Sequence, residues 1–194
     1  MNDYRFLSSF TVEQVMKDTD IPAQGPAIAG AVDLATAVDM LIEHPVYAVT
    51  RGDERIGRVD RSCINSLPFR CWIFGILTAV EMGLKNRHLV GEFWRTHIGA
   101  ERLEKARALK QERNRRGQDV NTVECLQFGD LARLHLQQDS VRWFDFASKR
   151  RAKSTFRQIE LLRNNVAHAQ DLGDDDWPLL ATIAQALPRI VTSD

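Results

Sequence analysis

The stretch 66–93, SLPFRCWIFGILTAVEMGLKNRHLVGEF, decides the fold of this chain. Ser66 is of the type that caps helix N-termini, and Pro68 suits a first helical turn. Apolar residues then recur at helical spacing to the end of the stretch. Its most apolar part, 71–80, is too short to span a bilayer, which needs about 20 apolar residues. We therefore expect a buried helix here, and no membrane partner.

Strand-like alternation is absent after this stretch, and four further helices are expected. Their ranges are about 100–116, 121–136, 148–169 and 174–188. Gly117 and Pro188 are expected to end two of them, and Asp174 to cap the last. A long loop is expected near 137–147. Residues 66–194 are therefore predicted to form an antiparallel helical bundle. The expected core positions are Leu126, Leu131, Leu134, Ala152, Phe156, Ile159 and Val166.

Residues 1–65 have a different pattern, which predicts a small α/β unit. An apolar stripe from Leu34 to Ile42 indicates a helix, which His44-Pro45 should end. Short alternations at 47–50 and 55–59 indicate two strands, and 51–54 is typical of a hairpin turn. The predicted class is α+β, mostly α, with a unit at 1–65 followed by the bundle at 66–194.

Composition favours a protein of the cytoplasm. The chain of 194 residues carries 26 basic and 26 acidic side chains, so it is not basic as a whole. Cys63, Cys71 and Cys125 lack metal-type spacing, and reduced thiols are expected. The N-terminus shows no signal-peptide pattern. No metal site and no cofactor is predicted.

The most informative segment for function is Arg163-Asn-Asn-Val-Ala-His168. A permanently charged guanidinium can hold a phosphate, and a histidine can transfer protons near neutral pH. On an ideal helix the two side chains lie about 140° apart, whereas Asn164 and His168 share a face. Arg163 and His168 converge only if the helix ends near Ala167 or if a second copy completes the site. Alternatively, Arg163 pairs with Glu160 and His168 caps the helix end.

The segment 161–172, LLRNNVAHAQDL, resembles the Arg-x4–6-His motif of HEPN domains, many of which are metal-independent RNases. HEPN domains are helical bundles with this motif late in the chain, and usually pair two motifs across a homodimer. The resemblance implies that Arg163 binds the scissile phosphate, His168 acts as acid and base, and Asn164 orients His168. It also implies an endoribonuclease of toxin or antiphage systems, with an antitoxin or regulatory partner. Some HEPN proteins only bind or regulate, so a non-catalytic nucleotide- or RNA-binding protein is the alternative.

The segments 15–22, 34–45 and 47–64 resemble a single CBS motif, a unit that usually pairs and binds adenosine nucleotides. After Gly57 the family places a hydroxyl residue and then an acid that holds the ribose. Asp60 and Cys63 stand in those places here. A carboxylate disfavours an approaching phosphate, and a thiol cannot replace the ribose-binding acid. We therefore expect a structural or dimerising role rather than adenosine-nucleotide binding.

A basic run at the start of the 148–169 helix is the expected RNA-binding surface, with a merely solvated face as the alternative. Trp143 and Phe144 could stack on bases, although packing in the core or in an interface is the favoured interpretation. The expected RNA-binding residues are Lys149, Arg150, Arg151, Lys153 and Arg157.

Overall fold

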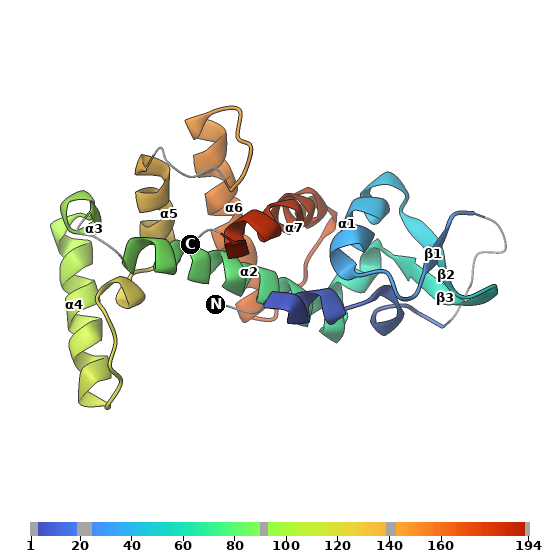
Figure 1. Cartoon of the computed structure of the whole chain (residues 1–194), viewed down its shortest axis with the longest axis horizontal. Coiled ribbons are helices and arrows are strands. Elements are labelled where there is room, and N and C mark those ends of the chain that lie inside the picture. The colour runs from blue at the N-terminus through green and yellow to red at the C-terminus, as the bar shows by residue number, and fades with distance from the viewer. Residues whose placement is uncertain (1–3, 19–24, 90–92, 139–142, 193–194) are drawn as a thin grey trace.

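The computed structural model describes residues 4–18, 25–89, 93–138 and 143–192. It shows a mostly helical α+β protein with a small sheet near the N-terminus followed by helices, which confirms the predicted class. The sheet lies at one end of the molecule and the helix α4 (Ala100–Arg115) at the other, with the long helix α2 (Leu67–Leu89) between them (Figure 1).

The sheet has the order β1-β2-β3. Strand β2 (Val46–Arg51) pairs antiparallel with β3 (Glu54–Asp60), as the two alternating stretches predicted. Strand β1 (Ala27–Ala29) pairs parallel with β2, and the helix α1 (Leu34–Glu43) forms the crossover between them. The pattern missed β1 because three residues beside a Gly- and Pro-rich segment carry too little alternation. Two short 3-10 helices, η1 (Tyr4–Ser9) and η2 (Val12–Gln14), precede it.

Helix α2 is the central element of the bundle. It is 23 residues long, and its part Leu67–Arg87 is long and apolar enough to cross a membrane by length and composition alone, although the run 71–80 is not. Its side chains at Trp72, Ile73, Ile76 and Val80 are nevertheless buried inside the protein. Ser66 precedes the helix, but its hydroxyl has no hydrogen-bond partner among the described residues. The Ser66 side chain therefore does not cap the helix.

The remaining helices differ from expectation in several places, and Gly173 rather than Asp174 is the N-cap before the last of them. The range 121–136 contains the 3-10 helix η4 (Val123–Cys125) and then α5 (Phe128–Gln137), because Asp130 accepts a hydrogen bond from the Gln127 backbone and starts a new helix there. Pro188 lies inside α7 (Trp177–Thr192) instead of ending it. Ile190, beyond the proline, is buried and faces Gly83 of α2, so packing against α2 stabilises the last turn of α7. The other elements are η3 (Arg61–Asn65), α3 (Phe93–His97), α6 (Lys149–Ala167) and η5 (Asp174–Asp176).

One hydrophobic core joins the sheet unit to the bundle, because its buried residues run from Leu7 to Ile190. Helix α7 packs against both α1 and α2. The Gln185 amide donates to Asp39 of α1 at 3.1 Å. All seven core positions expected in the bundle are buried or packed against this core.

Candidate nucleic-acid interface

Helix α6 carries the Arg163–His168 segment and ends inside it. His168 is the C-cap, and its backbone N–H donates to the Asn164 carbonyl at 3.0 Å. The Gln170 N–H reaches back to the Asn165 carbonyl at 2.9 Å, and Ala169 between them has a φ of 55°. This is a Schellman ending with alanine in the position that usually holds glycine. The helix therefore ends where convergence of Arg163 and His168 requires it.

The guanidinium of Arg163 is held against α2. Its Nη2 lies 3.4 Å from Glu81 Oε2, and its Nη1 donates to Asn164 Oδ1 at 3.2 Å. Its acidic partner is thus Glu81 rather than Glu160. A phosphate bound by Arg163 would have to displace a carboxylate that also pairs with Lys85 at 2.7 Å.

His168 is exposed and lies on another side of α6. Among the described residues no hydrogen bond joins its imidazole to Asn164, whose oxygen accepts from Arg163. Arg163 and His168 remain about 140° apart around the helix axis. Among the described residues no hydrogen bond or ion pair joins the two side chains within one chain.

Sequence reasoning missed the cation that caps α6. Arg70 of α2 donates to the carbonyls of Gln170 at 2.8 Å and Val166 at 3.4 Å. A positive charge is favourable at a helix C-terminus, where the dipole is negative. Arg70 stands about a hundred residues before these carbonyls, so no local pattern could have revealed the contact.

A groove of about 540 Å³ lies between α5 and α6, and five of its thirteen lining residues carry a positive charge. Lys149, Lys153 and Arg157 come from α6, so three of the five expected RNA-binding residues lie together. Arg133 of α5 and Arg102 of α4 add two more positive charges. The charged residues of the lining are Arg102, Arg133, Lys149, Lys153, Arg157, Asp130 and Glu160.

The geometry of this groove is held by contacts at its edge. Arg102 donates to the Gln127 side chain at 2.6 Å, and its Nε lies 3.8 Å from the buried carboxylate of Asp130. Gly129 allows a close approach to α6, because a Cβ there would lie 3.1 Å from the Glu160 carboxylate. Arg102 was not expected at this groove, since α4 shows little amphipathic pattern to orient its side chains.

The other two expected RNA-binding residues lie elsewhere on α6. Arg151 lines a second cavity, between α6 and α7. Arg150 is exposed and does not line the α5–α6 groove. The five residues therefore do not form one row.

The aromatic residues before α6 are part of the core. Trp143 and Phe144 are buried, which agrees with packing rather than base stacking. Trp143 stacks on His135 with ring centroids 4.5 Å apart. In the part of the chain that the structure describes, no group of histidine, cysteine and acidic residues could hold a metal ion. All three cysteines are free thiols.

The residues singled out in the CBS-like segment have structural partners. A Cβ on Gly57 would lie 2.7 Å from the Lys17 carbonyl, so glycine allows the two backbones to pair. Asp60 accepts from the Ser62 N–H at 2.9 Å and lies 3.4 Å from Lys17 Nζ and from Arg58 Nε. Burial opposes ionisation of Asp60, but the hydrogen bonds from Ser62 and the charge of Lys17 outweigh it and lower its pKa. Burial raises the pKa of the Cys63 thiol.

Comparisons with protein families, with curated proteins and with solved structures found no match to this chain.

Proposed function

We propose that the protein binds single-stranded RNA through the α5–α6 groove. The observation that carries this proposal is the excess of cations around the groove, five against two carboxylates. Clustered lysines and arginines attract a phosphate backbone by releasing its counterions. Because the chain as a whole has a net charge of zero, the groove is a local positive site and not part of a generally basic surface.

A metal-independent endoribonuclease is the second candidate, and the position of His168 favours it. On the helical wheel of α6, Lys153, Arg157, Asn164 and His168 lie within about 60° of one another. RNA held along this face would lead to the exposed imidazole at the helix end. The attacking nucleophile would be the neighbouring 2′-OH, giving a 2′,3′-cyclic phosphate and a 5′-hydroxyl, with His168 transferring the proton.

The phosphate-binding arginine is the part that one chain does not provide. Arg163 is paired with Glu81, and an ideal helix places it about 140° from His168. A homodimer in which each copy presents its Arg163 beside the other copy's His168 would complete the site, with Asn164 holding the guanidinium as it does here. An antitoxin or other regulatory partner could then act by covering the groove.

Binding is tested with a fluorescent single-stranded RNA titrated at several salt concentrations. The double variant Lys153→Gln with Arg157→Gln should weaken binding about tenfold and reduce the salt slope by about 1.4, or 0.7 for each lost contact. Arg55→Gln is the matched control, because it removes a charge from β3 at the far end of the molecule (Figure 1). Equal losses in both variants would mean that the groove is not the binding site.

Cleavage is tested by incubating the protein with total RNA in EDTA. Products ending in 2′,3′-cyclic phosphate, lost in His168→Ala at an unchanged melting temperature, would support the nuclease. The opposite result is RNA that is bound but stays intact at all protein concentrations, including those at which the protein dimerises. That result would exclude the nuclease and support the non-catalytic binding protein.

A further inference from the structure

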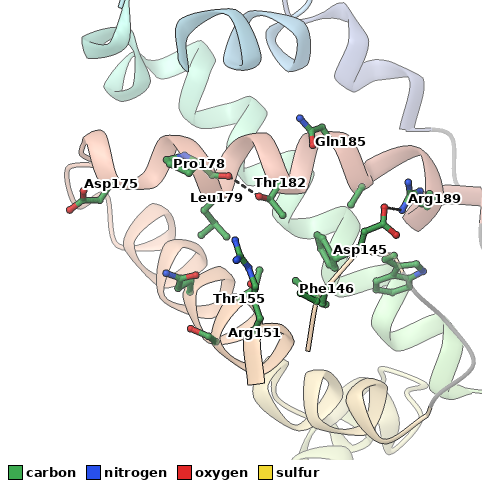
Figure 2. Close-up of a pocket in the computed structure, with 16 residues that line it drawn as sticks. Asp145, Phe146, Arg151, Thr155, Asp175, Pro178, Leu179, Thr182, Gln185 and Arg189 are labelled. Carbon is green, nitrogen blue, oxygen red and sulfur yellow. Dashed lines mark hydrogen bonds and ion pairs between the residues drawn. The ribbon is translucent and has the colours of Figure 1, made fainter. Parts of the chain in front are cut away.

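A second cavity, of about 680 Å³, lies on the opposite side of α6 from the basic groove. Helices α6 and α7 form two of its sides, and the segment 143–147 closes it between them (Figure 2). This volume is typical of sites for small ligands. The proposed RNA-binding function does not use it.

The walls of this cavity are fixed by packing and by an ion pair. Phe144 and Phe146 stack with centroids 5.2 Å apart, and both contact Phe156 of α6. Arg189 of α7 pairs with Asp145 at 2.9 Å, which ties the segment 143–147 to α7 (Figure 2). The cavity is therefore a preformed feature rather than a gap that side chains would fill by relaxing.

The polar groups that remain for a ligand are on α6. Among the described residues, no carboxylate pairs with the Arg151 guanidinium, because Asp145 is engaged by Arg189. Thr155 is only 8% exposed, and it lines the cavity beside Arg151. Figure 2 shows Arg151 and Thr155 on the α6 side of the cavity, with Leu179 and Thr182 of α7 across from them.

The chemistry of these walls selects one class of ligand. A guanidinium without a partner offers paired N–H donors suited to a carboxylate, sulfonate or phosphate. Beside it, Phe146, Pro178, Leu179 and Ala186 offer apolar contact. A free cation is disfavoured, because one of the two lining carboxylates already has a partner and the other, Asp175, stands at the far end (Figure 2).

We propose that the cavity between α6 and α7 binds a small organic anion with a flat apolar body. The anionic group contacts Arg151 and the Thr155 hydroxyl. The apolar body lies between Phe146 and Leu179. This site is independent of the α5–α6 groove, since Arg151 and the groove residue Lys153 lie about 160° apart around α6.

The test uses two fluorescent probes of nearly equal shape. 8-Anilinonaphthalene-1-sulfonate carries an anionic group, and N-phenyl-1-naphthylamine is its uncharged counterpart. Arg151→Gln should weaken binding of the sulfonate about tenfold or more and leave the neutral probe unchanged, because a charge-assisted hydrogen bond is lost. Ser154→Trp, an exposed position lining the cavity, should abolish binding of both probes by filling it.

Arg157→Gln, on the other side of the same helix, is the control and should bind both probes as the unaltered protein does. Circular dichroism and the melting temperature verify that each variant is folded. Sulfonate binding that is unaffected by Arg151→Gln, or affected equally for both probes, would overturn the anion site. Binding that survives Ser154→Trp would place the probes elsewhere and overturn the cavity itself.

Discussion

At the residue scale, single side chains determine how the candidate site is presented. Ala169 adopts a left-handed backbone conformation that costs a non-glycine residue about 1–2 kcal/mol. The sequence could not reveal this, because the usual signal for such a helix end is glycine, and the predicted helix ran two residues too far. The roles of Glu81 and Arg70 were also out of reach, since each meets its partner across more than eighty residues.

Replacing Ala169 by glycine should stabilise the protein. Relief of the left-handed strain gains about 1–2 kcal/mol, and the greater freedom of glycine in the unfolded chain offsets about 0.4–1 kcal/mol. A net gain of roughly 0.5–1 kcal/mol should appear in denaturant unfolding. The matched control, Ala167→Gly in the last helical turn, should lose about that much instead. Destabilisation by Ala169→Gly would show that the Schellman ending is not formed.

The Asp60 carboxylate should make stability depend on pH. Its pKa is lowered in the folded protein, so its contribution is present above the usual carboxyl range and is lost as pH falls through the folded value. Asp60→Asn should therefore cost about 1 kcal/mol at pH 7 and less below pH 4, because asparagine keeps the cap on η3 but loses the charge beside Lys17 and Arg58. Urea unfolding at both pH values measures this. A difference that stays constant between them would contradict the charged role.

At the scale of elements, periodicity predicted α1, α2 and α6 because their apolar positions recur over several turns, whereas α4 was expected mainly from its end at Gly117. It failed for β1, for the break between η4 and α5, and for Pro188 in α7. Those three features depend on a pairing partner, on a side-chain cap and on packing against α2, and none of these leaves a periodic pattern. The basic groove likewise needs three helices to meet, so only its α6 residues were expected.

Asn65 is the element-level link between η3 and the segment that follows α6. Its amide donates to the Leu172 carbonyl, and its oxygen accepts from the Leu172 N–H, both at 2.9 Å. Asn65→Ala should cost about 2 kcal/mol, because both hydrogen bonds are lost and are partly shielded from water. Asn86→Ala, at an exposed position on α2, should change stability by less than about 0.5 kcal/mol. Similar losses in the two variants, measured by urea unfolding, would contradict this link.

At the scale of the whole molecule, α2 presents an apolar face that the described residues leave exposed. Leu67 is 76% exposed and Phe74 is 54% exposed, and Cys71 lies between them at helical spacing. Phe6 of η1 is 53% exposed and approaches α2 at Gly75. The same helix holds Arg163 through Glu81, so a second copy packed here would lie near the motif.

The protein is therefore expected to be a homodimer joined through this face of α2. In a two-fold interface each Cys71 can meet its own copy, so mild oxidation should yield a cross-linked species of twice the 22.1 kDa chain mass. Cys71→Ser should abolish the cross-link, because the other two cysteines, Cys63 and Cys125, are buried. Light scattering should still report a dimer for this variant.

Phe74→Glu should give a folded monomer, since a charge would be buried at the contact. A monomer of the unaltered protein at micromolar concentration would exclude the dimer and the composite cleavage site together. A dimer that Phe74→Glu leaves intact would place its two-fold axis away from α2 and so separate it from Arg163.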